Sequence, residues 1–115
     1  MPVTKETLCH ARCAPCEGGV EPMDPATVEQ HLAATPEWAV NEARTAIYRK
    51  FPCGNFVQAV DLIRQIADLA EDEQHHPDLH LTGYRNLRVE LTTHAIGGLS
   101  ENDFIVAAKI DQRVP

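Results

Sequence analysis

Hydrophobic and polar positions follow their most regular pattern over residues 55–74, which predicts a long helix. Apolar residues recur at intervals of three and four, as on one face of a helix: Phe56, Val60, Ile63, Ala67 and Ala70. A second apolar set widens that face: Leu62, Ile66 and Leu69. Pro77 forces the residue before it toward extended geometry, so we expect the helix to end around Gln74 or His75.

Two further helices are indicated by their start signals. Asp24 is a good N-cap, Pro25 suits the first helical position, and Pro36 ends the helix that they begin. Ser100 caps a last helix, with Asp103 at its third position in an arrangement like a capping box. One face of this last helix is expected to carry Phe104, Ala107, Ala108 and Asp111.

Four strands are predicted, in two hairpins. The first hairpin joins a strand at residues 38–40 to one at residues 44–51. In the second, apolar and polar residues alternate over 79–84 and 87–94, with Arg85 and Asn86 at the turn. The order α-β-β-α-β-β-α predicts an α+β fold, a four-stranded antiparallel sheet with helices packed on one face. The other sheet face is only partly polar, so we expect some of it to meet another subunit.

Length and composition narrow the class of protein. The chain has 115 residues, which suits a single domain. Its formal net charge of -7 argues against binding nucleic acid or an anionic membrane, because both need clustered cations. No apolar run approaches the about 18 residues of a membrane-spanning helix. The opening residues also lack the apolar core of a signal peptide, so a cytoplasmic location is expected.

Residues 1–22 show no periodicity and are rich in proline and glycine. We therefore expect an irregular, cysteine-containing leader before a domain over residues 23–115. Cys9, Cys13 and Cys16 have C-x3-C-x2-C spacing and are a weak candidate metal site, for zinc with His10 or a distant group as the fourth ligand. The same spacing holds iron–sulfur clusters in radical enzymes, whose large barrel this chain is too short to form. A reduced leader without a fixed partner is the preferred interpretation.

Histidine is the residue type that most suggests chemistry. The chain has six, and four of them lie within residues 70–95. His75 and His76 stand where the long helix stops, His94 at a strand end, and Asp103 at the start of the last helix. Imidazoles beside carboxylates could donate and accept protons near pH 7. A metal site and purely structural histidines are the alternatives that spacing alone leaves open.

The spacing of these residues is ordered over a long stretch. Glu71 is followed, after three intervening residues, by His75, His76 and Pro77. Tyr84, His94 and Asp103 come next, after six, nine and eight intervening residues. Over residues 24–112 the sequence thereby resembles the pterin-4a-carbinolamine dehydratases. One departure is Leu79, where many members have an aromatic residue.

The resemblance implies an activity and the residues for it. The family removes water from a 4a-hydroxytetrahydropterin, released by an aromatic amino acid hydroxylase, and gives the quinonoid dihydropterin for tetrahydropterin recycling. The catalytic residues carried over are His75, His76 and His94. The substrate-binding residues carried over are Glu71, Gln74, Pro77, Thr92, Thr93 and Asp103. Of these, Glu71 and Asp103 either contact the substrate or orient the imidazoles. No metal or organic cofactor is implied, because the pterin is the substrate, and a homodimer or homotetramer is expected.

A second class of function is the alternative. Dehydratase-like proteins also serve as non-catalytic binding proteins, such as RuBisCO assembly factors or partners that steady a transcription-factor dimer. A binding protein would be free to lose the histidines, so their presence here favours catalysis.

Overall fold

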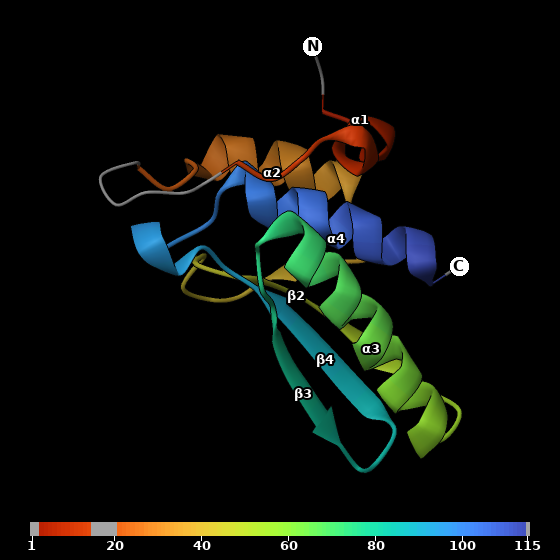
Figure 1. Ribbon diagram of the computed structural model, residues 1–115. Helices are drawn as coiled ribbons and strands as arrows, with labels where there is room; N and C mark the ends of the chain where they lie inside the picture. Colours follow the sequence, from red (N-terminus) through yellow and green to blue (C-terminus); the bar gives the residue numbers. More distant parts are fainter. Residues whose placement is uncertain (1–2, 15–20, 115) are drawn as a thin grey trace.

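The computed structural model of the chain describes residues 3–14 and 21–114. Over these residues the elements are α1 (Lys5–His10), α2 (Pro25–Ala34), β1 (Ala39–Val40), β2 (Ile47–Pro52), α3 (Phe56–Glu73), β3 (Asp78–Thr82), β4 (Asn86–Leu91), the 3-10 helix η1 (His94–Ile96) and α4 (Glu101–Arg113). The four strands form one antiparallel sheet, which confirms the predicted α+β class (Figure 1). None of the helices in this described part is long and apolar enough to cross a membrane.

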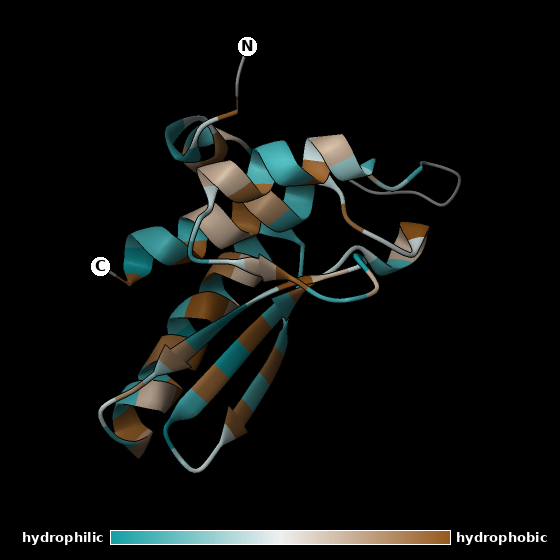
Figure 2. Ribbon diagram, turned by 180° about the vertical axis from the view of Figure 1, so that it is seen from behind, coloured by the Kyte–Doolittle hydropathy of each residue, from teal (hydrophilic) through white to brown (hydrophobic). Residues whose placement is uncertain are grey.

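The sheet has the order β1-β2-β4-β3, and every neighbouring pair is antiparallel. Ile47 pairs with Leu91 and Phe51 with Leu87, so the apolar residues of β2 and β4 stand side by side in the core. The residues at the alternate positions, Tyr48, Lys50, Arg88 and Glu90, point the other way, and hydropathy alternates along the strands (Figure 2). On that second face, no helix of the described chain lies over β3 and β4.

The second hairpin turns earlier than the sequence suggested. Residues 83–85 form the turn, and Asn86 already pairs with Thr82 as the first residue of β4. Gly83 and Tyr84 have φ of +54° and +56°, as in the tight turns that match the twist of paired strands. The glycine adopts this left-handed conformation at little steric cost, which places the turn there rather than at Arg85 and Asn86.

The packed face of α3 also differs from the prediction. The core side is formed by Ala59, Leu62, Ile66, Leu69 and Ala70. Phe56 and Val60, the leading residues of the predicted stripe, are 53% and 42% exposed. The helix has more apolar positions than the sheet and α4 can cover, so part of the expected stripe was assigned to the wrong side.

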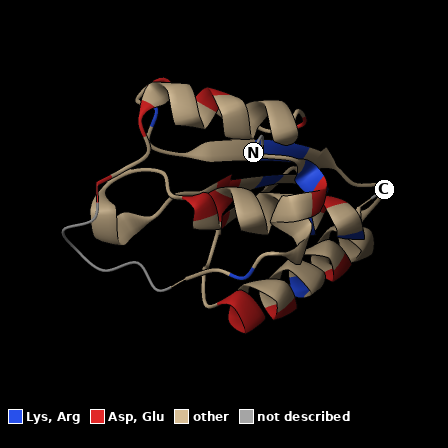
Figure 3. Cartoon of the chain, turned by 90° about the horizontal axis from the view of Figure 1, so that it is seen from above, with Lys and Arg blue, Asp and Glu red and all other residues tan. Residues whose placement is uncertain are grey.

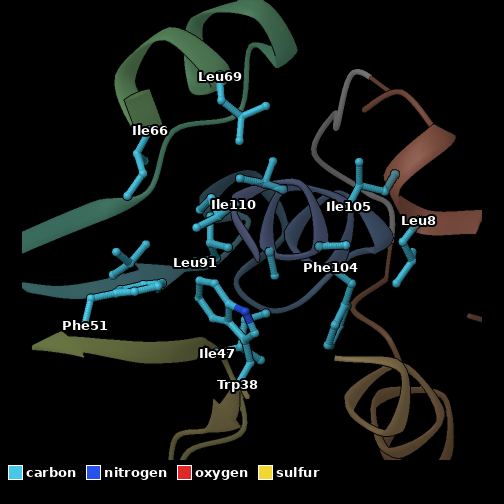
Figure 4. Close-up of a cluster of buried hydrophobic side chains, with 14 of the residues drawn as sticks. Leu8, Trp38, Ile47, Phe51, Ile66, Leu69, Leu91, Phe104, Ile105 and Ile110 are labelled. Atoms are coloured by element: carbon cyan, nitrogen blue, oxygen red, sulfur yellow. The ribbon is translucent and has the colours of Figure 1, made fainter. Parts of the chain in front are cut away.

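The last helix, α4, is enclosed rather than half-buried. Phe104, Ile105 and Ile110 are at most 2% exposed although they point in different directions around the helix axis (Figure 4). On one side α4 packs against α3. On the other it meets α1, and the Phe104 ring lies 5.0 Å from the ring of His31 in α2. The prediction of a single buried face is therefore too narrow.

The expected irregular leader contains a helix in its described part. Thr4 caps α1, exchanging hydrogen bonds with Thr7 in a capping box. Leu8 is 2% exposed and joins the main hydrophobic core against α4. A six-residue helix with one core residue is too short to show periodicity, which is why the sequence pattern missed it. Cys16 and the rest of residues 15–20 lie outside the described residues.

Candidate active site

A pocket of about 610 Å³ opens where α3 ends, β4 ends and α4 begins. All three predicted catalytic residues, His75, His76 and His94, line it. Three of the predicted substrate-binding residues line it as well: Gln74, Thr92 and Thr93. The other three, Glu71, Pro77 and Asp103, are outside its lining. Two of them bond to histidines of the pocket: Glu71 to His76 and Asp103 to His75.

The chain reaches the pocket through a sharp end to α3. Gln74 takes a left-handed conformation, with φ 54° and ψ 39°, and its backbone N–H donates to the carbonyl of Ala70. The N–H of His75 donates to the same carbonyl at 3.2 Å. Pro77 prevents the helix from resuming, so His75 and His76 project from the terminus. Gln74 also donates from its side chain to the carbonyl of Glu71 at 2.6 Å.

His75 is held by a buried carboxylate. Its Nε2 lies 2.6 Å from Oδ1 of Asp103, whose side chain has no exposed area. The other oxygen of Asp103 accepts from the Thr93 hydroxyl at 2.9 Å and from the Ser100 backbone N–H at 3.0 Å. An ionised carboxylate can only accept hydrogen bonds, so Nε2 of His75 is the donor in this pair. In the neutral ring, Nδ1 is then the nitrogen that can accept a proton.

His76 is paired differently. Its Nε2 contacts Oε2 of Glu71 one helical turn back. The side chains of His76 and Glu71 are 56% and 71% exposed, so the pair lies in solvent and orients the ring only loosely. The two histidines therefore differ in rigidity, although they are neighbours in sequence.

The third histidine, His94, lines the pocket from a separate segment of the chain. The sequence placed His94 at the end of a strand, but it begins η1, after β4 has ended at Leu91. Thr92 donates its hydroxyl to the carbonyl of Thr45 at 2.5 Å, and the Thr93 backbone N–H bonds to the carbonyl of Gly98. These bonds fix the two residues that precede His94.

Residues before the domain also line the pocket, which the sequence did not indicate. Arg12, Cys13 and Ala14 form part of its wall, together with Asn102 and residues at the end of α3. Asp and Glu residues are coloured red in Figure 3, and the end of α3 includes Asp72 and Glu73. Arg12 bonds to Asp72 across 60 positions of the sequence, and the histidines of the pocket lie farther along the chain still. No local pattern could have signalled this contact.

The acidic end of α3 contains a buried charge. The side chain of Glu73 is 1% exposed and accepts from Lys109 at 2.6 Å and from the backbone N–H of Cys13 at 2.9 Å. Burial would raise the pKa of Glu73, but these hydrogen bonds and the charges of Lys109 and Arg12 outweigh it and lower the pKa. Burial and the neighbouring Glu73 raise the pKa of Cys13 to about 12, so its thiol stays protonated and donates to the carbonyl of Asn102.

Two of the leader cysteines, Cys9 and Cys13, donate hydrogen bonds to carbonyls of α4. Cys9 donates from its thiol to the carbonyl of Ala108 at 3.4 Å, and burial raises its pKa. Within residues 3–14 and 21–114, no three His, Cys, Asp or Glu side chains are placed to hold a metal ion. The candidate site at Cys9, Cys13 and Cys16 includes a residue outside these ranges, so it stays a prediction.

Comparison with known proteins gives the family. The family model described as pterin 4 alpha carbinolamine dehydratase matches residues 21–113. The chain belongs to this family. Among pterin-4a-carbinolamine dehydratases, a Halorhodospira halophila protein that carries the family name is 46% identical over 105 residues, 91% of this chain and 95% of that protein. That alignment is long enough to extend into the residues before position 21.

Two further relatives agree. Pterin-4-alpha-carbinolamine dehydratase 2, mitochondrial, of Arabidopsis thaliana is 39% identical over 108 residues, 91% of this chain and 58% of that protein. The crystal structure of a transcriptional coactivator/pterin dehydratase from Brucella melitensis superimposes with a TM-score of 0.77 at 28% identity, covering 83% of this chain and 100% of that chain. The resemblance that the spacing of Glu71, the histidines and Asp103 suggested is confirmed at the level of family and fold.

Proposed function

We propose that the chain dehydrates pterin-4a-carbinolamine, a 4a-hydroxytetrahydropterin, to the quinonoid dihydropterin by histidine acid/base catalysis in tetrahydropterin recycling. One observation carries the proposal: His75, His76 and His94 line a single pocket although they come from two separate segments. A pocket of about 610 Å³ is also within the usual size range for small-molecule sites.

The proposed reaction needs an acid and a base. The C4a–O bond breaks, the hydroxyl takes a proton from the acid and leaves as water, and the base removes a proton from the ring nitrogen system. Imidazoles can perform both transfers near neutral pH, each positioned group typically contributing roughly 10²–10⁴-fold. No cofactor enters this scheme, because the pterin is the substrate.

The site geometry supports different roles for the residues. His75 and His94 are the principal acid and base, and His76 contacts the pterin and its hydroxyl. Asp103 has no exposed area, so we assign it the positioning of His75 rather than contact with the substrate. Thr93 shares that role, since its hydroxyl also donates to Asp103.

We further propose that the protein works in the cytoplasm as a homodimer or homotetramer, linked to the hydroxylase that supplies its substrate. Phe56, Val57 and Val60 form an exposed apolar patch on α3, with exposed fractions of 53%, 66% and 42%. Contiguous exposed apolar residues commonly mark a protein–protein interface. This patch supports self-association.

A direct assay tests the activity. The carbinolamine is generated with an aromatic amino acid hydroxylase, and formation of the quinonoid product is followed with and without this protein. We expect a faster rate with the protein. A folded protein that leaves the uncatalysed rate unchanged would contradict the proposal and favour the binding-protein alternative.

A substitution separates the site from the rest of the molecule. His94→Ala should lose nearly all activity while it remains folded, because His94 is one of the two proton-transfer groups. His80→Ala is the matched control, since His80 is an exposed histidine on β3 outside the pocket. Wild-type activity in His94→Ala would refute its role.

A further inference from the structure

The wall formed by Arg12, Cys13 and Ala14 has no part in the proton transfers proposed above. These residues precede the region matched by the family model, which starts at residue 21. They nevertheless face the same pocket as His75, His76 and His94. The wall could be a passive cover, or it could recognise part of the substrate.

Its position is fixed from both sides of the site. The backbone N–H of Cys13 donates to Oε1 of Glu73 at 2.9 Å, two residues before His75. The N–H of Ala14 donates to Oδ1 of Asn102 at 2.9 Å, and Nδ2 of Asn102 donates back to the carbonyl of Ala14 at 2.6 Å. Asn102 directly precedes Asp103 in the chain. The wall is therefore tied to both elements that carry the His75–Asp103 pair, and Arg12 is held at a defined place on the rim.

Arg12 is the chemically distinctive member of the wall. Among the described residues that line the pocket, it is the one with a permanent positive charge. Its NH1 lies 3.2 Å from Oδ2 of Asp72, and its NH2 donates to the Asp72 carbonyl at 3.3 Å. The two side chains are 66% and 65% exposed, so this ion pair is weak. NH1 also lies 3.5 Å from Oε2 of the buried Glu73, which is paired with Lys109 as well. The hydrogen bonds to Asp72 can therefore be exchanged for others while Glu73 keeps its pairing with Lys109. A guanidinium only donates hydrogen bonds, so a ligand group that it recognises must carry acceptors.

The depth of the residues indicates which part of the substrate lies there. The side chain of His75 is 11% exposed, far less than that of Arg12 at 66%, whereas His76 and His94 are exposed. The buried end of the pocket is therefore the end at His75, and the guanidinium lies nearer its mouth. The reacting carbon, C4a, must approach the histidines. In a pterin, C6 is two bonds from C4a, and its substituent extends away from the pyrimidine ring. That substituent therefore lies toward the mouth of the pocket.

We propose that Arg12 is a specificity-determining residue that donates hydrogen bonds to an oxygen-bearing C6 side chain of the pterin. The proposal rests on the dehydratase function, and it adds the class of substrate: a pterin with a hydroxylated C6 substituent is bound more tightly than one with an alkyl group. The chemistry at C4a is independent of Arg12.

Two substrates and two arginine variants test this. The carbinolamines of tetrahydrobiopterin, with a dihydroxypropyl group at C6, and of 6-methyltetrahydropterin are compared in the wild type, Arg12→Ala and Arg85→Ala. Arg85 is an exposed arginine in the β3–β4 turn, at the other end of the strands from the pocket. Arg12→Gln serves as a second variant, and thermal unfolding verifies that each protein is folded.

We expect the wild type to have a lower KM for the dihydroxypropyl substrate. In Arg12→Ala, that KM should rise roughly tenfold, the effect of one hydrogen bond to a charged group, while the KM for the methyl substrate and both kcat values change by less than about twofold. Arg85→Ala should behave as the wild type. An unchanged ratio of the two KM values in Arg12→Ala, or an equal loss for both substrates, would overturn the proposal.

Calorimetry measures binding of the stable ligands 7,8-dihydrobiopterin and 6-methyl-7,8-dihydropterin. This measurement distinguishes the role of Arg12 from the proposed dehydratase function. A wild type that neither turns over nor binds a pterin would refute the dehydratase function and the role of Arg12 together. A wild type that is active but binds both ligands equally would refute the role of Arg12 alone.

Discussion

At the scale of single residues, burial decides which groups can meet a substrate. Asp103 matches the family spacing, and the sequence left two roles for it, contact with the substrate or orientation of an imidazole. Its carboxylate is fully buried and bonded to His75, Thr93 and Ser100, which favours the second role. A carboxylate in this position can fix the tautomer and the orientation of the imidazole ring.

Asp103→Asn tests this arrangement without changing the size of the side chain. We expect kcat to fall at least about tenfold and its pH profile to shift, because the amide no longer presents an anionic acceptor to Nε2 of His75. KM should stay within about threefold, since Asp103 does not line the pocket. The measurement is kcat and KM from pH 6 to 9, with the exposed Asp61→Asn on α3 as control. A raised KM at unchanged kcat would instead place Asp103 in contact with the substrate.

At the scale of elements, α3 is apolar on more than one side. One side packs into the core through residues such as Ile66, which is 1% exposed. The other presents Phe56, Val57 and Val60 to solvent. A single chain can bury only the first side, so the second is available for another subunit.

Substitutions on the two sides of α3 should have different effects. The double variant Phe56→Ser, Val60→Ser should lower the mass of the assembly in light scattering, because it removes the exposed apolar patch. Ile66→Ala should lower the free energy of unfolding by about 2–5 kcal/mol, as a core truncation does. An unchanged mass in the double variant, with the wild type oligomeric, would place the subunit interface elsewhere.

At the scale of the whole molecule, a buried ion pair joins three separate segments. Glu73 at the end of α3 binds Lys109 of α4 and the backbone of Cys13 before the domain. Removal of one partner from such a pair leaves an uncompensated buried charge, which is costly. The pair therefore links the folding of the N-terminal segment to that of the sheet domain.

The lowered pKa of Glu73 predicts a pH-dependent stability. A carboxyl whose pKa is lower in the folded than in the unfolded state stabilises the fold above the unfolded value, which is near 4.5. That contribution is lost as the pH falls through the folded value. The difference in free energy of unfolding between the wild type and Glu73→Gln should thus have its largest value at pH 7 and become smaller below about pH 4.

Urea denaturation at pH 7, 5, 4 and 3 measures this difference. Glu29→Gln is the control, because Glu29 pairs with Arg44 on the surface, where both side chains are exposed. Its effect should be small at every pH. If the difference in free energy of unfolding between the wild type and Glu73→Gln stayed constant down to pH 3, the partners of the Glu73 carboxylate would not lower its pKa.

Much of the fold could be predicted from local signals. The N-cap Asp24 is where the start signals placed it, and α3 ends at Glu73, one residue before the expected terminus. The errors arose where several choices satisfy the local pattern equally. The side of α3 that is buried, the enclosure of α4 and the short helix α1 depend on partners distant in sequence, which periodicity does not contain.

The sequence by itself determined the family, the order of helices and strands, and the three candidate histidines. The signals for these, helix and strand ends and the spacing of polar residues, are local and can be recognised along the chain without any tertiary contact. The tertiary structure decided which groups face the pocket and which stand behind it. Asp103 lies behind His75, and Arg12 enters the wall from outside the matched domain. Those outcomes follow from burial and from contacts across about 60 positions, such as that between Cys13 and Glu73, and only packing in three dimensions fixes them.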